Sequence, residues 1–180
     1  VDDLISRAGG IALGGLQHLP EPMSDDMIVE APLNMTGYGL AVPIIGAIDL
    51  VRPRRRLVLD HKTTSSFRYM KEPEELGRDP QAITYGVKCL ELGAELHGMD
   101  EGPVTFGHVY YLTRGTVASA TSFVTISASN LRALFDEVMV QSVAGMAALT
   151  QVQVQDVPTN TEACSDFQGC PFRSRCAALG

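Results

Sequence analysis

Residues 45–64 have the sequence IGAIDLVRPRRRLVLDHKTT, which predicts two antiparallel strands joined by a tight basic turn. With the turn centred on its middle arginines, Asp49 on the first strand lies opposite Asp60 on the second. Facing Cβ atoms in such a pair are about 4.5–5.5 Å apart. Lys62 shares a face with Asp60 because side chains alternate along a strand. This hairpin is therefore predicted to carry two acids and a lysine on one face.

Two carboxylates this close repel each other unless a positive charge lies between them, and a hard divalent cation binds carboxylate oxygens readily. An ordinary surface ion pair between Asp60 and Lys62 is the competing interpretation. Because Asp disfavours strands, two of them at matching positions favour a metal site. The apolar side chains expected on the opposite face, as part of the core, are Ile48, Leu50, Leu57 and Leu59.

The composition is that of one globular domain with its own core. The 180 residues are 45% hydrophobic and 19% charged. No apolar run approaches the roughly 18–20 residues of a membrane span, and no signal peptide is visible, so we expect a cytoplasmic protein without a membrane partner. The chain begins at Val1 within a helical pattern, which indicates a fragment of something longer.

The charge is unevenly distributed. A net charge of −7 and a pI near 5.0 argue against bulk attraction to nucleic acid. Positive charge is nevertheless concentrated in residues 52–71. The basic side chains there are Arg52, Arg54, Arg55, Arg56, Lys62, Arg68 and Lys71. Any phosphate contact is therefore expected to be local to this segment.

The remaining sequence predicts helices alternating with strand pairs. In order, the elements are a glycine-weakened helix (2–18), a strand (27–33), the hairpin above, a polar crossing loop (63–78), a helix (79–96), a second hairpin (104–113 and 117–126) and an amphipathic helix (129–149). We expect an α/β fold, with helices on a central mixed β-sheet. A single domain would consist of a core (29–150) and a cysteine-bearing tail (151–180).

Four further side chains could join the site. Glu30 lies in the strand expected to neighbour the hairpin, although a lone acid on a short strand is more often solvent-exposed. Gln81 and Tyr85 share one face of their helix near its N-terminus, where the helix dipole favours an anion such as phosphate. A polar helix start with a half-buried tyrosine explains this spacing equally well. The His61 side chain is expected to point away from the acids, while its backbone carbonyl could face a metal.

The tail carries Cys164, Cys170 and Cys176, separated by five residues each. This spacing differs from the CxxC pairs of zinc sites, and a disulfide interpretation needs Cys89 to make the number even. Ligation of an iron–sulfur cluster, normally by four cysteines, is the better interpretation. Cys89 could be the fourth ligand, but a small buried hydrophobic residue in mid-helix is the favoured interpretation.

Four segments together resemble motifs of the PD-(D/E)xK nuclease superfamily, most closely its RecB-like branch of CRISPR-associated exonucleases and phage nucleases. They are VEAP (29–32), GAIDLV (46–51), LVLDHKTT (57–64) and QAITY (81–85). The tail, with CPFR at 170–173, is similar to the iron–sulfur tail of some members. The resemblance spans residues 29–176 and implies a restriction-endonuclease-like fold.

The resemblance also implies a metal site. Asp49 and Asp60 would bind Mg²⁺ or Mn²⁺, the His61 carbonyl would complete the site, and Glu30 would be an additional acid. Lys62 would position or help deprotonate the attacking water and stabilise charge on the phosphate. Metal-assisted phosphodiester hydrolysis needs such a Lewis acid, an activated water and a nearby cation.

The implied activity is that of a metal-dependent DNA exonuclease in recombination, repair or phage DNA processing. Gln81 and Tyr85 would orient the site and the DNA backbone. A helicase or recombinase is the implied partner, and the intact protein would carry a [4Fe–4S] cluster. The expected DNA contacts are Arg54, Arg55, Arg56, Arg68 and Lys71.

In one respect the chain departs from that branch, whose members place a metal-binding histidine and the first cluster cysteine upstream of the strand carrying the Glu30-like acid. Here only His18 lies upstream, in a proline-flanked linker where a structural or a solvated histidine is expected. Either the fragment lacks that region or the active site is incomplete. The alternatives are a catalytically impaired DNA-binding module and a cluster-bearing structural or redox domain. Lys62 argues against the last, because redox chemistry gives no reason for it.

Overall fold

The computed structural model describes residues 2–21, 25–153 and 156 of the chain. The chain consists of two compact units, Val1–Ala144 and Gly145–Gly180. The first unit contains the sheet and every site residue discussed below except the tail cysteines. Within the described residues, no helix has both the length and the apolar character that crossing a membrane requires.

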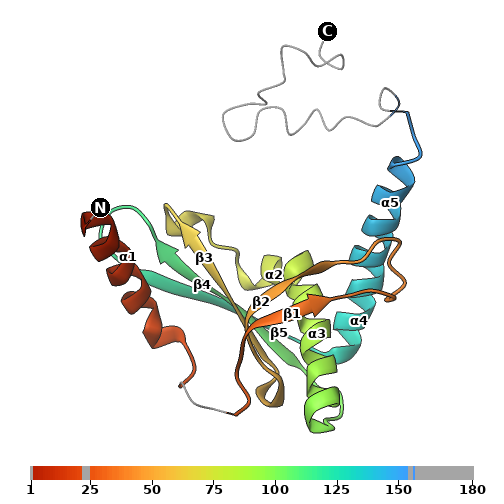
Figure 1. Ribbon diagram of the computed structural model, residues 1–180, viewed down its shortest axis with the longest axis horizontal. Coiled ribbons are helices and arrows are strands. Elements are labelled where there is room, and N and C mark those ends of the chain that lie inside the picture. The colour runs from red at the N-terminus through yellow and green to blue at the C-terminus, as the bar shows by residue number, and fades with distance from the viewer. Residues whose placement is uncertain (1, 22–24, 154–155, 157–180) are drawn as a thin grey trace. The chain divides into compact units, whose positions relative to one another are not determined.

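Five strands of the described chain form one mixed sheet in the order β1-β2-β3-β4-β5 (Figure 1). Their bounds are β1 (Ile28–Asn34), β2 (Ile45–Arg52), β3 (Leu57–Thr64), β4 (Val104–Leu112) and β5 (Ser119–Ile126). β3 and β4 are parallel, whereas the other neighbouring strands are antiparallel. A parallel pair needs a long crossover connection, and here it contains two helices. The predicted α/β fold with a mixed sheet is confirmed.

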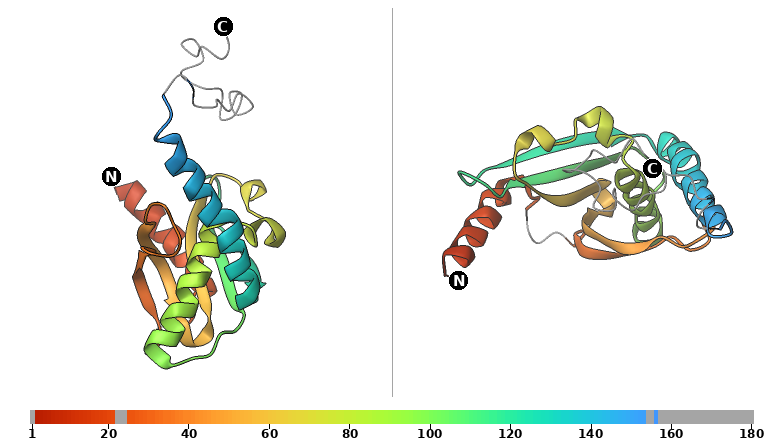
Figure 2. Two further views of the ribbon diagram at one scale, coloured as in Figure 1. Left: turned by 90° about the vertical axis from the view of Figure 1, so that its right-hand side faces the viewer. Right: turned by 90° about the horizontal axis from the view of Figure 1, so that it is seen from above.

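The helices also follow the predicted order (Figure 2). They are α1 (Asp2–Gly15), the 3-10 turns η1 (Leu16–His18), η2 (Pro53–Arg55) and η3 (Phe67–Tyr69), α2 (Pro73–Leu76), α3 (Pro80–His97), α4 (Ala128–Leu134), the π-helical η4 (Phe135–Val140) and α5 (Gln141–Leu149). Asp79 caps α3 as predicted, because its side chain accepts a hydrogen bond from the Gln81 amide. The helix predicted at 129–149 differs in containing the π-helical segment.

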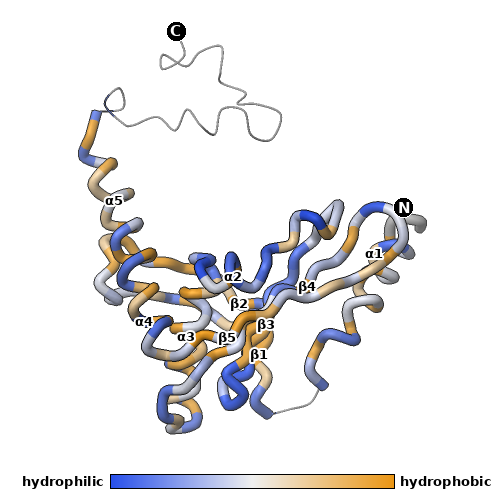
Figure 3. Tube along the Cα trace, turned by 180° about the vertical axis from the view of Figure 1, so that it is seen from behind, coloured by the Kyte–Doolittle hydropathy of each residue, from blue (hydrophilic) through white to orange (hydrophobic). Residues whose placement is uncertain are grey.

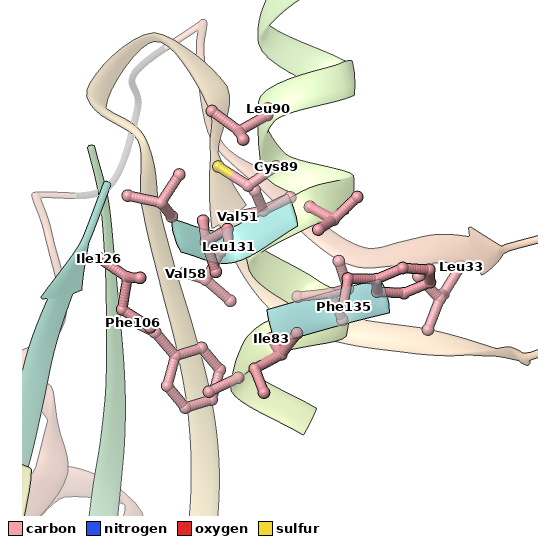
Figure 4. Close-up of a cluster of buried hydrophobic side chains, with 14 of the residues drawn as sticks. Leu33, Val51, Val58, Ile83, Cys89, Leu90, Phe106, Ile126, Leu131 and Phe135 are labelled. Carbon is pink, nitrogen blue, oxygen red and sulfur yellow. The ribbon is translucent and has the colours of Figure 1, made fainter. Parts of the chain in front are cut away.

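The main hydrophobic core lies between the sheet and the helices α3 and α4 (Figure 4). Phe106 on β4 packs near Tyr85 on α3, and Leu131 on α4 packs so closely on Gly86 of α3 that a side chain there would displace the Leu131 methyl groups. Hydrophobic residues are concentrated in the middle of the sheet and on the side of α3 that packs on β3 and β4 (Figure 3). α1 covers the other face, where Gly15 lies against the ring of Tyr111. The sheet is thus buried on both faces around its middle strands.

The predicted division of the hairpin side chains between the two faces is partly wrong. Leu50 and Leu59 are buried, but Ile48 joins Val51 in the main core cluster, which also contains Val58 two residues before Asp60. Residues 48 and 51 can share a cluster only if the alternation of side chains along β2 is interrupted between them. The core therefore includes the face that carries Asp60, and burial of that acid follows from this.

Candidate active site

One row of polar residues crosses the sheet. The register pairs Asp60 with His108 and His108 with Ser122. The register of β2 with β3 ends where Leu50 pairs with Leu59, so Asp49 and Asp60 are the next residues on their strands but are not themselves paired. Glu30 lies next to Asp49, because the residues on either side are paired: Val29 with Leu50 and Ala31 with Ile48. The sheet thus brings residues from five strands to one level.

The backbone is irregular where this row passes β1 and β2. Glu30 has a φ of 52°, in the left-handed region that a non-glycine residue rarely adopts, and its side chain is exposed. The recorded pairing of β2 with β3 stops at Leu50, and beyond it the His61 amide donates a 2.7 Å hydrogen bond to Asp49 Oδ2. The Asp49 carboxylate therefore replaces a backbone acceptor at the point where the ladder ends. Uncommon backbone geometry of this kind is concentrated at functional sites.

Asp60 is the central acid of the site. Its side chain is buried, with 2% of the residue exposed. Burial raises the pKa of Asp60 and the nearby charge of Asp49 adds to the rise, while the ammonium of Lys62 opposes it. Lys62 Nζ forms an ion pair with Asp60 Oδ2 at 2.6 Å, and this oxygen has no further hydrogen-bond partner among the described residues.

Helix α3 connects the acid to the neighbouring strand. Gln81 Nε2 donates to Asp60 Oδ1 at 2.8 Å and lies 3.2 Å from Tyr85 Oη. Tyr85 Oη in turn donates to the Ala47 carbonyl oxygen at 2.9 Å. The predicted shared face of Gln81 and Tyr85 is confirmed, and it contacts both β3 and β2.

The N-terminus of α3 differs from the anion site expected there. The carboxylate of Asp79 accepts the Gln81 amide hydrogen at 2.7 Å and forms an ion pair with Lys71. Burial of Asp79 acts to raise its pKa, but Lys71 and the amide outweigh burial and hold the pKa below its usual range. The anion that this helix end binds is therefore the chain's own carboxylate.

His108 is a site residue that sequence reasoning missed. It is 1% exposed on β4, its Nε2 lies 3.8 Å from Asp60 Oδ2, and its Nδ1 lies 2.9 Å from Tyr110 Oη. Burial, helped by the charge of Lys62, lowers the pKa of His108 to about 4, so the ring is neutral at neutral pH. The only sequence signal was a histidine within an apolar strand, because its position beside Asp60 depends on the parallel register of β3 and β4.

Several predicted site residues line two cavities, although Asp60 itself lines neither. A cavity of about 360 Å³ is lined by residues of β3 beyond Asp60, of β4, and of the crossover between them: Lys62, Thr63, Thr64, Tyr69, Lys71, Asp79, Gln81, His108 and Tyr110. A cavity of about 520 Å³ is lined by Glu30, Asp49 and His61 together with apolar residues of η1 and β1. The His61 ring was expected to point away from all the acids. It points away from Asp60, but it lines the same cavity as Glu30 and Asp49. Its Nδ1 forms a 2.7 Å hydrogen bond with Tyr111 Oη.

The basic residues also lie in two places. Arg54 and Arg56, in the turn between β2 and β3, make intramolecular contacts: the Arg54 guanidinium lies 3.1 Å from His97 Nδ1, and Arg56 donates to the Asp100 carbonyl oxygen at 2.7 Å. Arg55 is exposed in the same turn. Arg68 follows the other end of β3, close in sequence to the cavity residues Tyr69 and Lys71, and its guanidinium lies 4.6 Å from the centre of the Tyr69 ring. Of these basic groups, Lys71 lines the same cavity as Lys62, and Arg68 stacks on Tyr69 at the edge of that cavity's lining.

Two neighbouring carboxylates suit a hard divalent cation. Within residues 2–21, 25–153 and 156, no three His, Cys, Asp or Glu side chains are grouped as a ready-made metal site. Mg²⁺, however, usually keeps several waters and binds through one or two carboxylates. Asp60 supplies a buried Oδ2 whose one close partner among the described residues is the Lys62 ammonium, and Asp49 is the next acid in the row. These residues fit such an ion.

Of the four cysteines, only Cys89 lies among the residues that the structure describes. Cys164, Cys170 and Cys176 lie outside the described residues. Cys89 is fully buried in the core on α3, and burial raises the pKa of its thiol to about 12. The interpretation of Cys89 as a small buried hydrophobic residue is confirmed. His18 is partly buried, and its Nε2 lies 3.0 Å from Ser119 Oγ.

Comparison with protein families identifies the class of the chain. A family model of the PD-(D/E)XK nuclease superfamily matches residues 8–177. The chain therefore belongs to this superfamily, and its mixed sheet flanked by helices is the restriction-endonuclease-like fold. Neither a comparison with curated proteins nor one with solved structures gave a match. The superfamily is one of nucleases, which are hydrolases and typically use Mg²⁺ or Mn²⁺.

Proposed function

We propose that this protein is a Mg²⁺- or Mn²⁺-dependent DNA exonuclease of the RecB-like branch. The observation that carries the proposal is the buried Asp60, which is paired with Lys62 at 2.6 Å and held by Gln81 at 2.8 Å. A buried acid beside a half-exposed lysine, at the wall of a cavity, is the arrangement that metal-assisted phosphodiester hydrolysis requires.

The acids would hold the metal. Asp49 and Asp60 would be its ligands, with the His61 carbonyl and Glu30 as further oxygen donors. An ion bound there supplies a Lewis acid for the phosphate and lowers the pKa of a water. The hydrogen bond from the His61 amide already fixes the orientation of Asp49, and Gln81 fixes that of Asp60.

Lys62 would act on the substrate. Its side chain is about one-third exposed and reaches the 360 Å³ cavity, so its ammonium can stabilise charge on a phosphate and orient the attacking water. The hydrogen bonds of Gln81 to β3 and of Tyr85 to β2 hold α3 against both strands beside Lys62. Arg68 and Lys71, which follow β3, would contact the DNA backbone. Arg54, Arg55 and Arg56, in the turn that precedes β3, would be further contacts.

The wider assignment rests on the tail and the resemblance of the motifs. Cys164, Cys170 and Cys176 would bind a [4Fe–4S] cluster, with a fourth ligand other than the buried Cys89. The cluster would attach the polar tail to the domain, as metal binding does in small domains that lack a core. DNA processing in recombination, repair or phage replication, together with a helicase or recombinase, is the proposed setting.

The test is degradation of end-labelled DNA with Mg²⁺, with Mn²⁺ or with EDTA. We expect metal-dependent release of label, and the labelled end that disappears first gives the polarity. The variant Lys62→Ala should lose most of this activity while retaining DNA binding. DNA binding without cleavage under any metal condition would contradict the nuclease and support the DNA-binding module. That second candidate draws on one observation: Glu30 and Asp49 line the 520 Å³ cavity, whereas Asp60 does not.

A further inference from the structure

We infer that His108 is a positioning residue for Asp60, to which it donates its Nε2–H at the carboxylate oxygen Oδ2. The inference rests on the proposed function in so far as Asp60 binds a metal. It assigns a role to a histidine that neither the motifs nor the family match assigns. Three elements would then orient one carboxylate: α3 through Gln81, β3 through Lys62 and β4 through His108.

The protonation state of the ring follows from a chain of hydrogen bonds. The Lys71 amide donates to Tyr110 Oη at 3.0 Å, which uses that oxygen as an acceptor. Tyr110 is 5% exposed, so its hydroxyl hydrogen also needs a partner, and among the described residues His108 Nδ1 at 2.9 Å is the acceptor available. A neutral imidazole that accepts at Nδ1 carries its hydrogen on Nε2.

That hydrogen faces Asp60. His108 Nε2 and Asp60 Oδ2 are 3.8 Å apart and both are buried, and among the described residues Nε2 has no hydrogen-bond partner while Oδ2 has only the Lys62 ammonium. The buried Nε2–H loses free energy while it is unpaired, and Oδ2 can accept it in addition to the Lys62 ammonium, so the two atoms have a strong reason to join. A movement of less than 1 Å brings the two atoms to the usual hydrogen-bond distance of about 2.9 Å.

The contact matters most when substrate is bound. In the free protein Lys62 Nζ shares Oδ2, at 2.6 Å. When Lys62 turns towards a phosphate, Oδ2 loses this charge partner, and His108 remains as the group that holds the oxygen. Groups that orient a metal-binding carboxylate typically change metal affinity or activity by about 10- to 100-fold.

The tautomer is tested first, by ¹⁵N NMR of the full chain without metal. We expect hydrogen on Nε2 and none on Nδ1. The Nε2 resonance should shift in Asp60→Asn, which keeps the shape of the side chain but removes its charge. Hydrogen on Nδ1, or an Nε2 resonance that does not respond to Asp60→Asn, would overturn the inference. This measurement does not depend on nuclease activity.

The consequence for the metal is tested by Mn²⁺ titration calorimetry and DNA cleavage. His108→Leu should weaken Mn²⁺ binding about tenfold, and His108→Gln, whose amide can replace Nε2–H, should recover most of the loss. Tyr110→Phe should weaken it as well, because the tautomer is no longer fixed. Val87→Ala, a buried α3 change without a polar contact, is the control for general destabilisation and should bind as the parent does.

Two results would overturn the role of His108: parent-like Mn²⁺ affinity in His108→Leu, or equal losses in the leucine and glutamine variants. Failure of the proposed function would look different. In that case the parent and Asp60→Asn would bind Mn²⁺ equally weakly and neither would cleave DNA, while the NMR result would still show whether His108 donates to Asp60.

Discussion

Gln81 Nε2 donates a 2.8 Å hydrogen bond to Asp60 Oδ1, and this contact connects the first turn of α3 to the central acid of the sheet. The two residues are 21 positions apart in the chain. The contact depends on the Asp79–Pro80 helix start, which sets the rotation of α3 so that Gln81 faces β3. The orientation of the acid is therefore built into the position where this helix begins.

Gln81→Ala should reduce cleavage by about tenfold to a hundredfold, because Asp60 loses one of the groups that orient it. The loss should be smaller than in variants of Asp60 itself, since the acid is still present. Steady-state cleavage rates at several Mn²⁺ concentrations measure the effect. Glu95→Ala, on the exposed surface of the same helix, is the matched control. Parent-like rates in Gln81→Ala would show that the contact has no functional role.

Tyr85→Phe should lower the free energy of unfolding by about 0.5–1.5 kcal/mol, the net value of one hydrogen bond. The lost contact is the 2.9 Å bond to the Ala47 carbonyl, which fixes β2 to α3 beside Asp49. Urea unfolding measures the change. An unchanged stability would mean that water replaces the hydroxyl without loss.

Asp79→Asn should destabilise the protein near neutral pH and have little effect in acid. The native pKa of Asp79 is held below its usual range, so its ionised form contributes stability above the unfolded pKa of about 3.9. That contribution is lost as the pH falls through the lower, folded pKa. Asparagine keeps the capping oxygen but loses the ion pair with Lys71. Urea unfolding of both proteins from pH 7 down to pH 3 should show the difference shrinking, and a difference independent of pH would contradict the assignment.

Arg68→Gln should weaken DNA binding and make it less salt-dependent, by roughly 0.9 in the log–log slope for one duplex phosphate contact. Arg55→Gln is the comparison, because Arg55 is equally exposed but lies in the turn at the other end of β3. Fluorescence anisotropy between about 50 and 200 mM salt measures both. A change in slope with Arg55→Gln alone would move the DNA path away from Lys62 and towards the basic turn.

Much of the fold could be predicted from local sequence. The antiparallel pairing of β2 with β3 followed from the hairpin pattern, and the start of α3 followed from Asp79 and Pro80. The side-chain contacts of Gln81 and Tyr85 followed from helical spacing. Each of these relationships is set within a few residues of chain or by one tight turn, where the backbone has few alternatives.

What could not be predicted depends on non-local register and on irregular backbone. His108 is beside Asp60 only because β3 and β4 pair in one particular register across a crossover of about forty residues. The location of Ile48 in the main core needed the irregularity near Glu30, whose positive φ has no signal in the sequence. The capture of the α3 N-terminus by Asp79 and Lys71 likewise required both side chains in place.

The central claim is that Asp60 binds the metal that a nuclease uses, and Asp60→Asn tests it most directly. Burial raises the pKa of Asp60, so the ionised carboxylate destabilises the folded protein. The free energy of unfolding therefore falls as the pH rises through the folded pKa. The neutral variant should therefore unfold at the same or a higher temperature than the parent at pH 7.5 without metal, which excludes misfolding as the cause of a lost activity. Mn²⁺ should raise the unfolding temperature of the parent but not of the variant.

The decisive measurement is cleavage of end-labelled DNA by the parent and Asp60→Asn, side by side, in Mn²⁺. We predict metal-dependent degradation by the parent and no degradation above background by the folded variant. Cleavage by Asp60→Asn at the rate of the parent would contradict the account.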